Sequence, residues 1–278
     1  MIISIASGKG GTGKTTVATN LALAIGDTQF IDCDVEEPNA NVFLKVEIME
    51  KEKVTVEIPE IDEEKCDCCG KCSDFCMYNA LAVVPYKVLV FPELCHSCRG
   101  CELVCPNNAI HWRERIVGWI EHGVTNDIDF YHGLLNIGEI QAIPIIKFLK
   151  RKINIDKNVI LDAPPGTSCP VIETINASDY CILVAEPTPF GLHDLKLAVS
   201  TVRHLSIPFG VVINRDGIGD KKVELYCQSE KIPILMRIPH SSDIAHLYSK
   251  GIPFVEKIEG WRNRFQQLFD RIQKEVER

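Results

Sequence analysis

The amino-acid sequence predicts an α/β protein in which helices cover both faces of a doubly wound, mainly parallel sheet. A glycine-rich loop, Gly8–Thr15, follows an apolar run typical of a buried strand and precedes a stretch with helical periodicity. Strand-like and helical stretches also alternate in the second half of the chain, as expected for βαβ units. Nine of the 13 cysteines lie between Cys66 and Cys105, a clustering that indicates metal ligands, and we expect this stretch to form a small α+β unit inserted into the larger fold.

Length and composition limit the number of domains and the classes of function that the chain can have. At 278 residues, the chain is long enough for one α/β domain and a small additional unit. Its apolar runs are far shorter than the about 20 residues that span a bilayer. The net charge of −8 argues against nonspecific nucleic-acid binding as the main activity. Because no charged and apolar leader precedes the first strand, we expect a cytoplasmic protein without stable membrane insertion.

The loop Gly8–Thr15, with the sequence GKGGTGKT, satisfies the phosphate-loop pattern G-x-x-x-x-G-K-[ST] in full. Glycines allow successive backbone N–H groups to surround phosphate oxygens at the positive end of the following helix. Lys14 would reach the outer phosphates, and the Thr15 hydroxyl would hold Mg²⁺. A chance glycine-rich turn is the alternative. The sequence therefore predicts a site for ATP or ADP with Mg²⁺, formed by Gly8, Gly10, Gly11, Thr12, Gly13, Lys14, Thr15 and Thr16.

Lys9 is a second lysine inside this loop. With it, the motif resembles the deviant-Walker ATPases: the MinD/ParA group, the Mrp cluster carriers and the nitrogenase iron protein. In that family the extra lysine crosses a dimer interface to the partner's nucleotide, so the resemblance implies a homodimer with Lys9 and Lys14 as catalytic cations. From its charge alone, Lys9 would help to hold a triphosphate.

The next strand-like run, Gln29–Cys33, leads into acidic residues. The sequence from Asp32 to Asn39 has the form D-x-D-x-x-x-P-N, which resembles the family's first switch. In that switch the second Asp orients the attacking water, so the resemblance implies Asp34 as a catalytic residue, with Asp32 in support. An ordinary acidic strand end is the alternative.

A Glu- and Lys-rich stretch, Lys45–Lys65, with only short β-like segments such as Val54–Ile58, precedes the inserted unit. Two runs of the form C-x₂-C-x₂-C-x₃-C follow, about 29 residues apart, and each is the bacterial ferredoxin run. Between them, Ala80–Val84 and Lys87–Phe91 are predicted to form a hairpin. Residues Ile110–Gly123 are expected to supply the closing strands.

In two-cluster ferredoxins the fourth cysteine of each run ligates the other cluster. Zinc is the alternative, but zinc sites favour paired C-x₂-C knuckles with four ligands for each ion. An extra thiol, Cys68, and Met77 in place of a proline remove no ligand. The sequence therefore predicts two [4Fe–4S] clusters, one held by Cys66, Cys69, Cys72 and Cys105 and the other by Cys95, Cys98, Cys101 and Cys76.

The larger fold resumes after the insertion. Gly138 precedes an apolar stretch through Phe148, and the strand-like run Asn158–Leu161 ends at Asp162. The sequence DAPPGT that starts there resembles the Mrp-type second switch. The resemblance implies that Asp162 supports the Mg²⁺ shell and that the backbone of Gly166 senses the γ-phosphate.

Two further strand-like runs, Tyr180–Ala185 and Gly210–Ile213, flank a predicted helix near Leu192–His204. The sequence VVINR around the second run resembles the family's adenine-side motif, which makes Asn214 a candidate for base recognition; a turn residue is the alternative. The tail carries apolar residues on one helical face. Core packing is favoured over membrane binding for this face, because its charges are mixed.

Cys169 lies seven residues after Asp162, and the nitrogenase iron protein has a bridging-cluster cysteine at the same offset. The second cysteine that such a bridge needs is absent from Tyr131–Glu139, so no cluster shared between two chains is expected. Two interpretations remain, a buried small residue and a thiol near the dimer axis whose reactivity follows the nucleotide.

Taken together, these motifs resemble MinD-superfamily P-loop ATPases with an inserted two-cluster ferredoxin domain. The predicted boundaries are 1–52 and 124–278 for the ATPase domain and 53–123 for the insertion. The function expected first is ATP hydrolysis coupled to electron transfer, with a redox or cluster-accepting protein as partner. A cluster- or metal-assembly ATPase like Mrp is the alternative, although the Mrp C-P-x-C pair is absent and Cys227 stands alone. The third possible function is that of a non-enzymatic positioning or scaffold switch like MinD.

Overall fold

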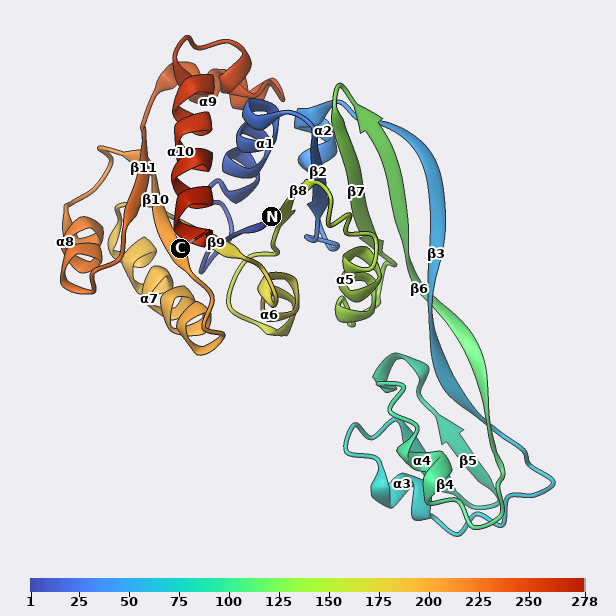
Figure 1. Ribbon diagram of the computed structural model, residues 1–278. Helices are drawn as coiled ribbons and strands as arrows, with labels where there is room; N and C mark the ends of the chain where they lie inside the picture. Colours follow the sequence, from blue (N-terminus) through green and yellow to red (C-terminus); the bar gives the residue numbers. More distant parts are fainter. Residues whose placement is uncertain (278) are drawn as a thin grey trace.

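The computed structural model describes residues 1–277, and its main feature is a nine-stranded sheet. Seven neighbouring strands run parallel, and two antiparallel strands complete one edge. The strand order is β11-β10-β9-β1-β8-β2-β7-β6-β3 (Figure 1). The parallel strands are β1 (Ile2–Ala6), β2 (Thr28–Asp32), β7 (Ile128–Leu135), β8 (Asn158–Asp162), β9 (Tyr180–Ala185), β10 (Phe209–Asp216) and β11 (Ile234–Pro239). The prediction of a mainly parallel α/β sheet is confirmed.

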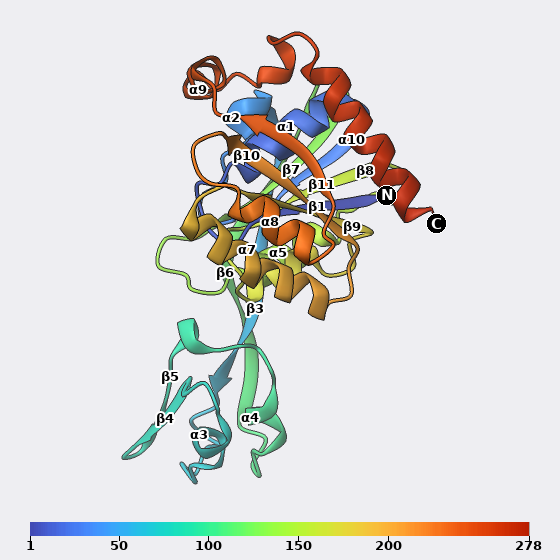
Figure 2. The same cartoon turned by 90° about the vertical axis from the view of Figure 1, so that its left-hand side faces the viewer.

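Helices cover both faces of this sheet, because the strands bury apolar side chains on each side. On one face, the strand residues Ile3, Ile5 and Phe30 belong to a single core that they share with the first helix layer. On the other face, Ala6 and Leu183 belong to a second core and Ile31 to a third, both covered by the opposite helix layer. The two layers lie on opposite sides of the strands (Figure 2). The first layer holds α1 (Lys14–Ile25), α2 (Ala40–Leu44) and α10 (Trp261–Val276); the second holds α5 (Ile143–Lys150), α6 (Cys169–Ile175), α7 (Pro189–His204) and α8 (Lys222–Ser229). The helix α9 (Ser242–Ser249) precedes the C-terminal segment.

The apolar face of α10 packs against α1, as core packing of the tail predicts. Phe265 and Ile272 are fully buried there, and the indole of Trp261 meets the ring of Phe254 edge to face at 5.0 Å. Among residues 1–277, none of the helices has both the length and the apolar character needed to cross a membrane.

We expect Phe265→Ala to lower the free energy of unfolding by about 3–5 kcal/mol, because a fully buried aromatic ring leaves a cavity. Asn263→Ala, on the exposed side of the same helix, should change it by less than about 0.5 kcal/mol. Denaturant unfolding of both variants measures this difference. Equally small effects would place the α10 face outside the core.

Two long antiparallel strands, β3 (Glu47–Ile61) and β6 (Ile110–Thr125), form a ribbon that leaves the body. The expectation of only short β-like segments in this stretch was wrong. The first seven residues of β3 are exposed, and Glu50–Lys53 alternate Glu and Lys, as is common for edge strands that are protected by charge. The predicted boundaries at 52/53 and 123/124 fall inside these two continuous strands.

The pairing of β6 with β7 determines from which side of the body the ribbon projects. In the sheet, Gly118 of β6 pairs with Leu135, the carboxyl end of β7, and the remainder of β6 continues beyond that end. Because β7 is parallel to β2 and β8, the ribbon extends past the carboxyl ends of the parallel strands (Figure 1). Nucleotides bind at this edge in open α/β sheets.

At its far end the ribbon carries a distal unit, residues 62–109. The predicted hairpin is confirmed as β4 (Leu81–Val84) paired with β5 (Lys87–Val90). Two short helices, α3 (Lys71–Phe75) and α4 (Gly100–Leu103), occupy equivalent positions in the two cysteine runs. They pack closely, since a methyl group on Gly100 would lie 2.1 Å from the ring of Phe75.

Candidate functional site

The glycine-rich loop joins β1 to α1 at the carboxyl edge of the sheet. Gly11 and Gly13 have φ angles of 76° and 91°, which side chains rarely adopt, so the loop turns at these glycines. Lys14 is the first residue of α1 and is only 7% exposed. The Thr12 hydroxyl is buried and has no hydrogen-bond partner within residues 1–277. The loop therefore presents a helix N-terminus, a buried cation and a free hydroxyl, a set that suits phosphate.

Asp162 is the last residue of β8, and Asp34 lies just beyond the end of the neighbouring strand β2. Both carboxylates are close to Lys14. Asp162 is fully buried, and burial raises its pKa to about 6; the Lys14 ammonium opposes this rise. Burial also raises the pKa of Asp34, again against the charge of Lys14. In the described part of the chain, neither carboxylate oxygen of Asp162 has a hydrogen-bond partner. A buried carboxylate without donors, beside a loop Thr, fits the oxygen ligands that Mg²⁺ prefers.

Asp32 has a different role from Asp34. Its Oδ1 accepts the backbone N–H of Asp34 at 3.0 Å, and its Oδ2 accepts those of Asn39 and Ala40 at 3.2 and 3.1 Å. Asp32 therefore shapes the turn that presents Asp34 and closes the N-terminus of α2. On the second switch, Gly166 has a φ of 96° and donates its N–H to the Ser7 carbonyl, at 3.1 Å, just before the glycine-rich loop.

Asn214 contacts the glycine-rich loop itself. Its Nδ2 donates to the Thr12 carbonyl at 2.7 Å, and a methyl group on Gly13 would lie 2.3 Å from the same nitrogen. Lys9 lies 3.5 Å from Glu186, a buried acid that also pairs with Arg215. Glu186 was not predicted from the sequence. The local signal for it is its position as an acidic residue directly after the buried strand β9.

We expect Asp162→Asn to stabilise the nucleotide-free protein near neutral pH but not in acid. The unfolded carboxyl ionises near 3.8 and the folded one near 6, so the free energy of unfolding of the wild type falls as the pH rises between these values. Above about pH 6 the variant should be more stable than the wild type by on the order of 3 kcal/mol. Urea unfolding across this range measures it, and a difference that does not vary with pH would contradict the account.

The two switches enclose a cavity of about 240 Å³, lined on one side by Asp34 and Val35 and on the other by Pro164, Pro165 and Ser168. Cys169 follows directly as the first residue of α6, and its side chain is exposed. The interpretation of Cys169 as a buried small residue is therefore wrong.

We expect the alkylation rate of Cys169 to differ severalfold between the ADP state and a state with a non-hydrolysable ATP analogue, because thiolate reactivity follows its surroundings. Cys227 is fully buried and should react slowly in both states, which makes it the internal control. Mass spectrometry of labelled protein measures both rates. Equal rates at Cys169 would leave it without a nucleotide-dependent role.

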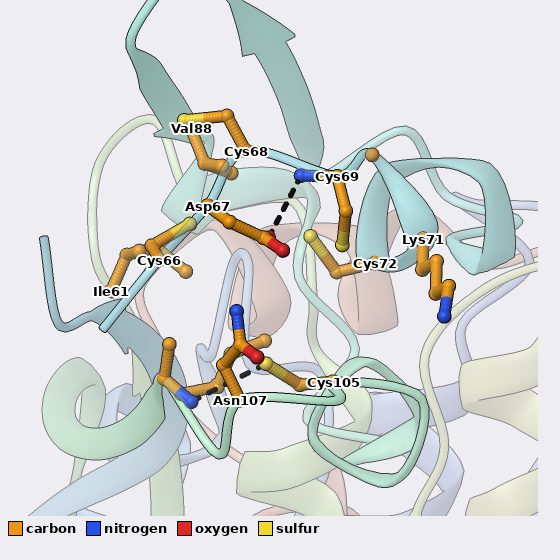
Figure 3. Close-up of a pocket in the computed structure, with 13 residues that line it drawn as sticks. Ile61, Cys66, Asp67, Cys68, Cys69, Lys71, Cys72, Val88, Cys105 and Asn107 are labelled. Atoms are coloured by element: carbon orange, nitrogen blue, oxygen red, sulfur yellow. Dashed lines mark hydrogen bonds between the residues drawn. The ribbon is translucent and has the colours of Figure 1, made fainter.

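The cysteines of the two runs line two separate cavities in the distal unit. The first quartet, Cys66, Cys69, Cys72 and Cys105, surrounds one cavity together with Cys68 and Ile61 (Figure 3). The second cavity is lined by the second quartet, Cys76, Cys95, Cys98 and Cys101. Each quartet thus combines three cysteines of one run with the last cysteine of the other.

Backbone N–H groups point at three of these sulfurs. Ala80 and Ala109 donate to the Sγ atoms of Cys76 and Cys105 at 3.4 and 3.3 Å, in equivalent places of the two runs, and Ser97 donates to Cys95 at 3.4 Å. Within residues 1–277, no three His, Cys, Asp or Glu side chains form a group that could hold a metal ion. Cysteine thiols supply most of the donor groups around both cavities, a choice typical of soft metals and iron–sulfur clusters. Asp67 and Asn107 also line the first cavity, and His96 also lines the second.

The profile described as CobQ/CobB/MinD/ParA nucleotide binding domain matches residues 3–254. An uncharacterized protein of Methanocaldococcus jannaschii is 32% identical over 96% of both chains. An iron-sulfur cluster carrier protein of Pyrococcus horikoshii is 25% identical over 91% of this chain and 78% of its own. Among solved structures, the septum site-determining protein MinD of P. horikoshii, complexed with Mg-ADP, superposes with a TM-score of 0.60 at 20% identity, covering 99% of this chain and 96% of its own.

Proposed function

The chain belongs to the CobQ/CobB/MinD/ParA nucleotide-binding family, and from this premise we propose that it is a dimeric, Mg²⁺-dependent ATPase whose nucleotide state controls electron transfer through two [4Fe–4S] clusters. Residues 53–123 would form an inserted two-cluster ferredoxin domain between the ATPase segments 1–52 and 124–278. The expected partners are a second copy of the chain and a redox protein.

The observation that carries this proposal is the exchange of cysteines between the two quartets. Cys105 completes the cavity of the first run, and Cys76 completes that of the second. Two-cluster ferredoxins exchange their fourth cysteines in this way. Zinc is the alternative occupant, and its structural sites favour paired C-x₂-C knuckles with four ligands for each ion, whereas these eight cysteines form two crossed quartets.

The clusters would supply one-electron carriers, and the chain's own groups would hold them. The N–H groups of Ala80 and Ala109 donate to the sulfurs of Cys76 and Cys105, and such bonds stabilise thiolate charge and help to set reduction potentials. The ribbon places both quartets beyond the carboxyl edge of the sheet, the edge that also carries the glycine-rich loop.

At the nucleotide, most of the work is positioning and charge stabilisation. Lys14 would hold the outer phosphates and Lys9 would add a second cation. Thr15 and Asp162 would hold Mg²⁺, and the free oxygens of Asp162 support that role. Asp34, presented by Asp32, would orient the attacking water.

Potentiometric titration of the anaerobically purified protein tests the coupling. With a non-hydrolysable ATP analogue in place of ADP, we expect the ratio of reduced to oxidised cluster at a fixed ambient potential to change about tenfold, which corresponds to 59 mV for one electron. Identical titrations in the two nucleotide states, with nucleotide bound in both, would overturn the proposed electron transfer.

A second candidate is delivery of an iron–sulfur cluster, favoured by the 25% identity to a protein named as an iron-sulfur cluster carrier. The two functions differ in the fate of the iron. An electron donor should keep its iron through repeated ATP turnover in the presence of an apo-ferredoxin acceptor, whereas a carrier should lose iron to the acceptor.

A further inference from the structure

We propose that Gln141 is a positioning residue that couples the first switch to the second cysteine quartet. It belongs to the connecting segment Asn136–Ala142, which joins β7 to α5. The inference rests on the proposed function, since it assumes a nucleotide at the switches and a cluster at the second quartet. It adds to that function the residues that would transmit the nucleotide state from the first switch to the second quartet.

One end of the connecting segment lies at the first switch. The backbone N–H of Leu135, just before the segment, donates to the Val35 carbonyl at 2.8 Å. Val35 is buried directly after Asp34. At the other end, Ala142 lines the same 240 Å³ cavity as Asp34 and Pro164. A displacement of the Asp34–Val35 backbone therefore reaches both ends of the segment.

The connecting segment contacts the second quartet through Gln141, next to its C-terminal end. The amide Nε2 of Gln141 donates to the Cys95 carbonyl at 3.0 Å and to the Glu93 carbonyl at 3.3 Å. Cys95 is buried at 7% exposure and lines the second cavity. These bonds connect the body to the distal unit apart from the β3–β6 ribbon.

Contacts of Glu139 hold the connecting segment in a defined conformation. Its carboxylate is 2% exposed, pairs with Arg115 of β6, and accepts the N–H groups of Ile140 and Gln141 at 3.0 and 3.2 Å. Asn136 ties the start of the segment to β6 through its N–H and the Val117 carbonyl, at 3.0 Å. Within residues 1–277, the Nε and Nη2 atoms of Arg115 are buried without a hydrogen-bond partner, so the pairing around Glu139 is incomplete in this conformation.

The driving force is charge. A triphosphate at the glycine-rich loop brings several negative charges toward Asp34, whose pKa is already raised by burial. Repulsion, or a cation recruited between them, changes the position of the Asp34–Val35 backbone. Leu135, which is bonded to Val35, and the connecting segment move with this backbone. The hydrogen bond from Gln141 to the Cys95 carbonyl changes in length or breaks as a result. The hydrogen bonds and exposure around a ligand cysteine tune the potential of an iron–sulfur cluster.

The test compares wild type, Gln141→Ala and Gln267→Ala as full-length, anaerobically purified proteins. Gln267 lies on the exposed side of α10 and serves as the matched control. All three should bind nucleotide and iron equally. The about tenfold nucleotide response of the reduced-to-oxidised ratio should fall below about twofold in Gln141→Ala and persist in Gln267→Ala. A full response in Gln141→Ala would overturn the inference.

Hydrogen exchange at the amides of residues 93–99 separates this inference from the proposed function. In the wild type we expect the ATP analogue to change their exchange, and in Gln141→Ala we expect no change. If this pattern is found while the potentials do not respond to nucleotide, the path through Gln141 stands and the electron-transfer function fails. If exchange in the wild type is the same with ADP and the analogue, the path is wrong.

Discussion

Replacing Lys14 by alanine is expected to weaken nucleotide binding by roughly a hundredfold or more, since the outer phosphates lose a buried, pre-positioned cation. A loss of this size equals about 2.7 kcal/mol of binding free energy. The fold should tolerate the change, because Asp162 and Asp34 then lose only a neighbouring charge. Calorimetric titration with Mg-ATP measures the affinity. Unchanged affinity in Lys14→Ala would exclude this loop as the nucleotide site.

Lys9→Ala is the matched control in the same loop. Its ammonium is 34% exposed and pairs with Glu186 at 3.5 Å, so its removal should leave the loop and the nucleotide affinity largely intact. Hydrolysis or dimerisation should be lost if Lys9 acts across an interface, as the sequence motif implies. Near-complete ATPase activity in this variant would remove the deviant-Walker interpretation.

The second large effect is expected at the crossed cysteines. Cys105→Ser should damage the cluster of the first quartet, although Cys105 belongs to the second run, and iron should fall from about eight to about four per chain. Cys76→Ser should damage the other cluster. Electron paramagnetic resonance of the reduced proteins distinguishes the two losses.

Cys68→Ser provides the control for this experiment. Its thiol lines the same cavity as the first quartet but is not one of the four predicted ligands, so both clusters should survive. If Cys105→Ser and Cys101→Ser lose the same signal, the crossed assignment is wrong.

Much of the fold could be predicted because its signals are local. The strand β9 is a run of six consecutive buried residues, and β1 and α1 flank a motif that requires a strand before it and a helix after it. Two short strand-like stretches, Ala80–Val84 and Lys87–Phe91, likewise indicated the distal hairpin, whereas the helices α3 and α4 were not predicted. Each of these elements is specified by fewer than about 20 contiguous residues.

The elements that escaped prediction depend on distant partners. The exposed Glu and Lys residues of β3 resemble a linker, and only pairing with β6, across the whole insertion, makes them a strand. Asn214 reaches the Thr12 carbonyl 202 residues away, a contact that no local pattern encodes. Gln141 carries no motif either, and its bond to the Cys95 carbonyl becomes visible only once the ribbon has placed the distal unit.

Iron and sulfide analysis of protein purified without oxygen tests whether the two quartets hold two clusters. Two cubane clusters held by the two quartets predict about eight iron atoms and about eight sulfides per chain, with no zinc. Zinc in their place, or about four iron atoms per chain in fully loaded protein, would contradict the account.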